Sequence, residues 1–177
     1  MQLQTARLTL ALVDETARPE EFLPLFNSNP DLVEATELFT GKRAFDLSDV
    51  EMYLWQAMAR DNSQCLAIKL SETGELVGTA VLLTPHPDEA FPWIGLLLIS
   101  SELQGKGLGT EAVTAIEKHL VKQRWQEVRL NILQAIPRVR HFWERLGYTV
   151  LGERLDSNGR PCWILSKRLS LSILPHA

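Results

Sequence analysis

The segment Gln104-Gly105-Lys106-Gly107-Leu108-Gly109-Thr110 constrains the fold of this chain more than any other. It follows an apolar, strand-like run from Trp93 to Ile99 and opens a segment with helical periodicity. Its alternating glycines allow a tight turn and let a ligand approach the backbone closely. The first N–H groups of a helix have no partner within the helix, and the helix dipole favours an anion there. The order strand, glycine loop, helix therefore predicts a phosphate-binding turn.

The spacing of these glycines differs from the two commonest phosphate-binding motifs. A Walker loop requires Gly-Lys-Ser/Thr at its end, whereas Lys106 here precedes Gly107. The dinucleotide-binding motif requires a third glycine three residues after the second, and an acidic residue about twenty residues further on. A glycine turn without a ligand is the alternative interpretation.

The rest of the chain alternates between strand-like and helix-like patterns. Strands are expected over residues 7–13, 65–70, 76–84, 93–99, 127–133, 148–155 and 162–169. Helices are expected over 19–27 and 31–38, from Ser48, directly after the glycine loop, and from Pro137 to Gly147. Ser48 and Glu51 form the expected capping box of the third helix, and Val50, Leu54 and Met58 its core face. Asp156 to Gly159 is the expected turn between the last two strands.

This order predicts a mixed α/β fold in one domain spanning residues 1–177, with its core from about residue 5 to 169. The 18 basic and 22 acidic side chains give a net charge of −4, which provides no field for nucleic acid or an anionic membrane. No apolar run is long enough to span a bilayer, and the N-terminus lacks a signal-peptide pattern, so we expect a cytoplasmic protein. Cys65 and Cys162 have no metal-binding or redox spacing, and we expect no metal site.

The spacing Gln-x-x-Gly-x-Gly, formed by Gln104, Gly107 and Gly109, resembles the acyl-CoA pyrophosphate loop of the GNAT N-acetyltransferases. Thr5-Ala6-Arg7-Leu8-Thr9-Leu10 is similar to the first strand of the ribosomal-protein-alanine acetyltransferase branch of that family. Phe142-Trp143-Glu144-Arg145-Leu146-Gly147-Tyr148 is similar to the family's Phe-Tyr-x-x-x-Gly-Phe segment. The resemblance spans residues 5–169 and implies a central, mostly antiparallel sheet flanked by helices.

The resemblance also implies acetyl-CoA as the cosubstrate. A bulge in the strand before the glycine loop would part that strand from the next, and pantetheine would lie in the gap. Backbone groups of Leu97, Leu98 and Ile99 would then pair with pantetheine amides, and one of their N–H groups would polarise the thioester carbonyl. The pyrophosphate would bind the glycine-loop residues, namely Gln104, Gly105, Lys106, Gly107, Leu108, Gly109 and Thr110. Arg138 and Arg140 lie at a helix start, where the dipole disfavours cations; a nearby CoA phosphate would explain them, with solvated surface side chains as the alternative.

Three positions depart from the family pattern. Trp93 stands where a general-base glutamate is common, Trp143 where a tyrosine often protonates the leaving thiolate, and Ile136 near a pantetheine-binding asparagine. The sequence therefore assigns no catalytic residue. His86, Asp88 and Glu89, in the Pro-rich loop before Trp93, are the candidates, with a solvated polar loop as the alternative.

Two classes of function remain open. The first is an N-acetyltransferase that acts on a primary amine, either a small molecule or a peptide N-terminus. If the early helices line the acceptor cleft, the surplus of acidic residues over residues 1–60 would attract a cationic acceptor, with a solvated acidic face as the alternative. The second is an acyl-CoA-binding or regulatory module with little catalysis, and an unrelated nucleotide-binding enzyme is a more distant third. The sequence leaves the oligomeric state open, a homodimer included.

Overall fold

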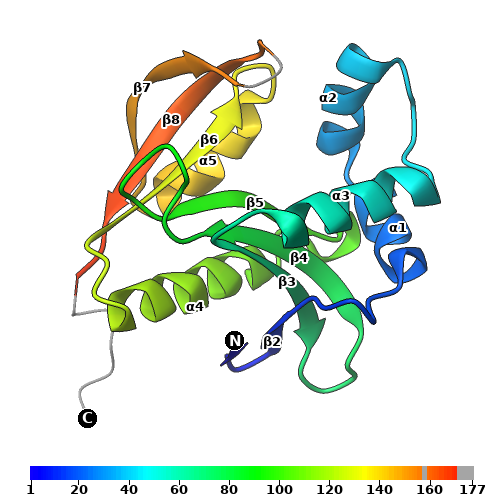
Figure 1. Cartoon of the computed structure of the whole chain (residues 1–177), viewed down its shortest axis with the longest axis horizontal. Coiled ribbons are helices and arrows are strands. Elements are labelled where there is room, and N and C mark those ends of the chain that lie inside the picture. Colours follow the sequence, from blue (N-terminus) through cyan, green and yellow to red (C-terminus); the bar gives the residue numbers. More distant parts are fainter. Residues whose placement is uncertain (157–158, 171–177) are drawn as a thin grey trace.

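The computed structural model describes residues 1–156 and 159–170, with the side chains of 36–39 excepted. Within these residues the strands form an eight-stranded sheet in the order β1-β2-β3-β4-β5-β6-β8-β7 (Figure 1). The strands are β1 (Gln2–Gln4), β2 (Leu8–Leu12), β3 (Ser63–Leu70), β4 (Leu76–Leu83), β5 (Trp93–Ile99), β6 (Glu127–Leu133), β7 (Thr149–Leu155) and β8 (Pro161–Arg168). The helices are α1 (Pro19–Asn27), α2 (Pro30–Thr40), α3 (Leu47–Ala59), the short η1 (Ser101–Leu103), α4 (Leu108–Lys122) and α5 (Pro137–Arg145).

Neighbouring strands of the described sheet run antiparallel, except β5 and β6, which run parallel. The parallel pair follows from the chain order, because α4 carries the chain from the end of β5 back to the start of β6. The predicted mixed α/β fold with a mostly antiparallel sheet is therefore confirmed.

Helices cover both faces of the sheet, and a hydrophobic core lies under each set (Figure 1). The apolar stripe of α4, with Ile116 and Leu120 fully buried, packs on one face. Phe26 of α1 and Leu54 of α3 pack on the other. Strand β5 contributes to both cores because its side chains alternate, and this central position fixes the site at its end.

The expected capping box of α3 was wrong. The helix begins at Leu47, and Asp46 is its N-cap. The Asp46 carboxylate accepts a hydrogen bond from the backbone N–H of Asp49, while the Asp49 carboxylate accepts one from the N–H of Asp46, each at 3.0 Å. Ser48 instead donates its hydroxyl to Asp46 at 2.8 Å. A carboxylate accepts more strongly than a hydroxyl, so the aspartate two residues earlier takes the capping position.

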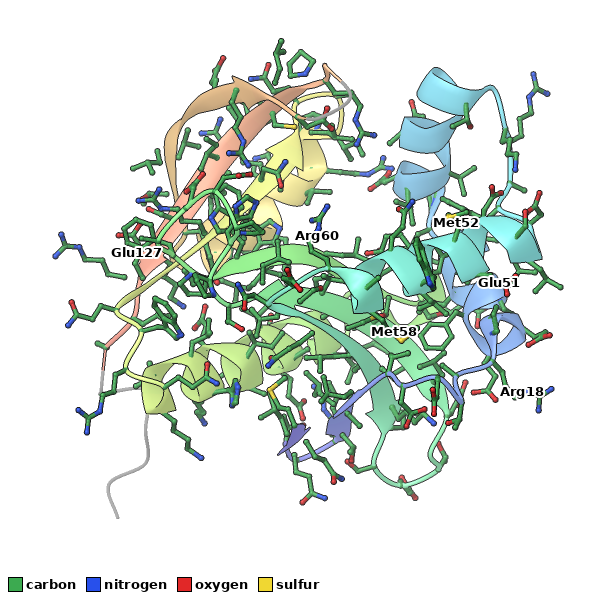
Figure 2. All side chains as sticks on the ribbon, in the orientation of Figure 1. Arg18, Glu51, Met52, Met58, Arg60 and Glu127 are labelled. Carbon is green, nitrogen blue, oxygen red and sulfur yellow. The ribbon has the colours of Figure 1, made fainter. Side chains whose placement is uncertain are left out.

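Two further details differ from the sequence prediction. Strand β1 was missed, because three residues are too few to show an alternating pattern. Met58 was expected in the core, but its side chain remains 37% exposed at the end of α3, where Figure 2 labels it. The predicted turn from Asp156 to Gly159 lies partly outside the described residues. No helix in the described part of the chain combines the length and hydrophobicity that crossing a membrane requires.

Candidate functional site

Strands β5 and β6 part along their length. The register between them, in the described residues, consists of Trp93 opposite Arg129. Immediately beyond this pair, β5 contains a bulge: Ile94 faces Leu82 of β4 and Leu96 faces Val81, so Gly95 is the additional residue. The bulge lies where β5 and β6 part, as the resemblance to the acetyltransferase loop implied. Residues 96–99 of β5 then line a groove of about 550 Å³.

The glycine loop closes one end of this groove. Gly105 and Gly107 have φ values of +74° and +82°, a left-handed conformation that residues with a Cβ rarely adopt. A Cβ at Gly109 would lie 3.3 Å from the Phe142 ring, so this position also favours glycine. Helix α4 begins at Leu108 and directs its unpaired N–H groups to this end.

Most of the predicted cofactor-binding residues line the groove, namely Leu97, Leu98, Ile99, Gln104, Gly105, Gly107, Gly109 and Thr110. Lys106 and Leu108 do not. The Lys106 side chain is exposed, and Leu108 is buried in the core beneath α4. These two residues contribute to the loop through their backbone.

Gln104 anchors the loop to the turn between α1 and α2. Its side-chain amide donates to the side-chain oxygen of Asn29 at 2.7 Å and to the backbone carbonyl of Ile99 at 3.0 Å. Asn29 is itself buried, and its amide donates to the carbonyl of Leu25. Sequence reasoning missed Asn29, because an Asn-Pro pair indicates only a helix boundary.

The other side of the loop is anchored by Arg7. Its guanidinium donates to the Glu111 carboxylate at 2.7 Å and to the backbone carbonyl of Lys106 at 3.0 Å. Burial acts to raise the pKa of Glu111, but hydrogen bonds from Thr5 and Arg7 outweigh it and lower that pKa. The Thr5-Ala6-Arg7 segment was identified in the sequence only as part of a strand, and its role in supporting the loop was missed.

The three departures from the family pattern lie in different surroundings. Trp93 is 2% exposed, and Trp143 packs in the core with Phe142 and Tyr148, their ring centroids 5.1 and 5.0 Å away. Ile136 lines the groove as an apolar residue. Neither tryptophan provides an acid or base with a pKa near neutrality.

The candidates His86, Asp88 and Glu89 lie in the loop between β4 and β5. This loop leads into Trp93, where β5 and β6 are still paired. The His86 ring is 5.1 Å from that of Trp93, and its Nδ1 accepts a hydrogen bond from the Asp88 N–H at 3.2 Å. Burial lowers the pKa of His86. Glu89 pairs with Arg129 at 2.9 Å and with Arg154 at 3.1 Å. None of the three is among the described residues that line the groove.

The walls of the groove carry opposite charges. Arg138 and Arg145 of α5 line one wall, and Asp31 of α2 lines the other. Arg138 forms an ion pair with Asp31. Arg140, which was also expected near a CoA phosphate, does not line the groove. It pairs with Glu144 at 2.6 Å and lies over the Trp163 ring. The groove thus combines an apolar floor with an anion-binding end.

This arrangement fits an elongated ligand with phosphate at one end. Beyond Trp93, the edge of β5 that faces β6 offers unpaired backbone groups to the amides of such a ligand. Side chains able to hold a metal ion do not gather in groups of three or more anywhere in residues 1–156 and 159–170.

Comparisons with known proteins agree with this geometry. The model of the acetyltransferase (GNAT) family matches residues 31–148, more than half of the chain. An acetyltransferase from Thermus thermophilus has a TM-score of 0.68 and 23% identity, over 96% of this chain and 100% of its own. A GNAT-family acetyltransferase from Bacillus anthracis has a TM-score of 0.72 and 15% identity, over 95% and 98%.

A third solved structure is the spermidine N-acetyltransferase of Vibrio cholerae in complex with CoA and spermine. It has a TM-score of 0.67 and 13% identity, over 93% of this chain and 97% of its own. At these identities the structures show a shared fold alone. No curated protein sequence matches the chain. These matches support the family and do not support the ribosomal-protein-alanine acetyltransferase branch that the first strand suggested.

Proposed function

The chain belongs to the acetyltransferase (GNAT) family, and on this premise we propose that it transfers an acetyl group from acetyl-CoA to a primary amine. The observation that carries the proposal is the parting of β5 from β6 directly beside a glycine loop at a helix N-terminus. This is the arrangement that an acyl-CoA requires, because its pantetheine arm carries amides and its pyrophosphate is an anion.

Acetyl-CoA fits the groove through the backbone. The N–H groups of residues 105–110 face the pyrophosphate, and the backbone of residues 97–99 pairs with the pantetheine amides. Arg138 and Arg145 supply positive charge on the α5 wall. This binding depends little on side chains, so the tryptophans at 93 and 143 do not prevent it.

The reaction is direct attack of a neutral amine nitrogen on the thioester carbon. The new C–N bond forms and the C–S bond breaks, CoA leaves as a thiolate, and the nitrogen loses one proton that the thiolate can finally take up. An alkylammonium has a pKa near 10, so it must lose a further proton before it attacks. The chain contributes mainly by holding thioester and amine together, and positioning alone accounts for a large share of such catalysis.

The proton acceptor is proposed to be in the loop 84–92 or a water held there. Among the described groove-lining residues, Asp31 is the only carboxylate, and it is paired with Arg138. His86, Asp88 and Glu89 remain the candidates. Glu89 is already shared between two guanidinium groups, which favours a role in holding the loop.

The acceptor is proposed to be cationic in solution, in keeping with the acidic surplus over residues 1–60. The spermine complex of the Vibrio cholerae neighbour supports including polyamines among the amines tested. A cytoplasmic location and a homodimer also remain proposals.

A second candidate function is an acyl-CoA-binding module with little catalysis. The specific observation in its favour is the burial of Trp93 and Trp143 at the two positions where the family often has its base and acid. Both functions require the same cofactor groove and differ only in turnover.

The deciding experiment is calorimetric titration with acetyl-CoA, followed by thiol release with a panel of amines. Gly107→Glu is the test variant, because a carboxylate at this point of the loop blocks and repels the pyrophosphate. Gly74→Glu is the matched control: it adds the same charge at a similar positive φ of +74°, in the hairpin between β3 and β4.

We expect micromolar binding in the wild type and in Gly74→Glu, and a loss of at least about a hundredfold in Gly107→Glu. Binding that Gly107→Glu leaves intact would contradict the placement of the pyrophosphate. Binding without CoA release for any amine would favour the second candidate function.

A further inference from the structure

The ion pair between Asp31 and Arg138 spans the groove from one wall to the other. Asp31 lies in the first turn of α2 and Arg138 in the first turn of α5, and both line the groove. Arg138 donates a hydrogen bond from Nε to one carboxylate oxygen of Asp31, and a terminal nitrogen of the guanidinium forms the ion pair with the other. The side chains are 64% exposed for Arg138 and 27% for Asp31, so the pair lies at the mouth rather than in the core.

Local structure does not explain this placement of a cation. Arg138 lies at the N-terminus of α5, where the helix dipole disfavours positive charge. An exposed ion pair also contributes little to folding stability, since solvent screens it. An arginine at this position is better explained by an anion that enters the groove.

The pair is close to the anion-binding end of the groove. Asn29, two residues before Asp31, holds Gln104 at the start of the glycine loop. The glycine loop and the guanidinium that Asp31 now holds therefore line the same groove. A phosphate carries more charge than a carboxylate and matches the guanidinium fork equally well.

We propose that Asp31 is a displaceable counter-ion that sets the selectivity of the groove for CoA. This inference rests on the proposed function. In the free protein, Asp31 occupies Arg138. When acetyl-CoA binds, its phosphate replaces the carboxylate at Arg138, helped by the many other contacts of the cofactor. A small anion such as inorganic phosphate lacks those contacts and cannot displace Asp31.

The test measures the dissociation constant of CoA and the inhibition of CoA binding by inorganic phosphate. Asp31→Asn removes the competing charge, Arg138→Gln removes the cation, and the double variant combines them. Glu34→Gln is the matched control for Asp31, because Glu34 is an exposed acid on the same helix that does not line the groove. Arg140→Gln is the control for Arg138, on the same helix and also outside the groove.

We expect Asp31→Asn to bind CoA roughly fivefold more tightly and to become sensitive to inorganic phosphate. We expect Arg138→Gln to bind about tenfold more weakly. In the Arg138→Gln background, Asp31→Asn should give less than half of the gain in CoA affinity that it gives alone. The reason is that Arg138, for which Asp31 and the phosphate compete, is no longer present. The two controls should stay within about twofold of the wild type.

The inference is overturned if Asp31→Asn binds CoA no more tightly than Glu34→Gln does. It is also overturned if the gain persists in full in the Arg138→Gln background, since Asp31 would then act without Arg138. Absence of CoA binding in the folded wild type would instead overturn the proposed function, and this inference with it.

Discussion

The two ends of strand β5 differ in whether backbone geometry or side-chain contacts shape the adjoining loop. At its C-terminal end the groove is built from backbone, namely the positive φ values at Gly105 and Gly107 and the start of α4. At its N-terminal end, the loop 84–92 is held by side chains, chiefly Glu89 between Arg129 and Arg154. We call these the cofactor end and the loop end. Backbone geometry tolerates side-chain variation, so a fold can keep its cofactor while the acceptor side changes.

The first prediction tests whether a buried ion pair fixes α4, the helix that begins at the cofactor end. Glu117 of α4 is 3% exposed; Lys167 donates to it at 2.7 Å and the Tyr148 hydroxyl at 3.0 Å. Glu117→Gln leaves the Lys167 cation without its counter-ion. We expect the free energy of unfolding in urea to fall by about 3 kcal/mol. Glu144→Gln, which breaks an exposed pair with Arg140, should cost at most about 0.5 kcal/mol. Similar losses in the two variants would show that α4 is not fixed in this way.

The second prediction concerns the hydrogen bonds that join the glycine loop to α1. Gln104→Ala removes the amide that bridges Asn29 and the carbonyl of Ile99. We expect CoA affinity to fall about fivefold to tenfold, because the loop loses its fixed position. Gln123→Ala, an exposed glutamine at the far end of α4, should have no effect. Asn29→Ala should reproduce the loss, and the double variant should be no worse than either one. Additive losses would show that Gln104 contacts the ligand directly.

The contrast between the two ends explains what the sequence could predict. The strand, glycine loop and helix were predicted because glycine spacing and apolar periodicity are local signals. The contact of Gln104 with Asn29 and that of Arg7 with Glu111 were not, since each joins residues at least 75 positions apart. The sequence pattern predicted Ser48 as the N-cap of α3, and the reciprocal hydrogen bonds of Asp46 and Asp49 are seen only in the structure.

The third prediction addresses the loop end. Glu89→Gln weakens the two ion pairs that hold the loop 84–92 against β6 and β7. We expect the KM for the amine to rise about threefold, with the pH profile of kcat unchanged, because the Glu89 carboxylate is engaged by two guanidinium groups and does not line the groove. Glu72→Gln makes the same charge change at an exposed position in the hairpin between β3 and β4 and should leave the KM unaltered. A shifted pH profile in Glu89→Gln alone would instead identify Glu89 as the proton acceptor.

The fourth prediction, with the smallest expected effect, compares how two histidines contribute to the pH dependence of stability and of amine binding. Burial lowers the pKa of His86 in the loop and of His119 on α4. Asp88 and Glu89 oppose the shift at His86, whereas Arg154 and Arg60, the latter labelled in Figure 2, reinforce it. Lys122 and the N-terminal amine reinforce it at His119. Each histidine is thus harder to protonate in the folded chain than in the unfolded one.

The sign of the pH dependence follows from this difference. Below the unfolded value near 6.5, the unfolded chain binds more protons than the folded one, so stability declines as the pH falls from 7 toward 5. We expect the stability of His86→Gln and of His119→Gln to decline less than that of the wild type over this pH range. The measurement is the urea concentration at the midpoint of unfolding, determined at each pH. Only His86→Gln should also change how the amine KM depends on pH, because His119 lies in the last turn of α4 and not in the loop 84–92. An equal change of KM in the two variants would mean that the loop end has no separate role in acceptor binding.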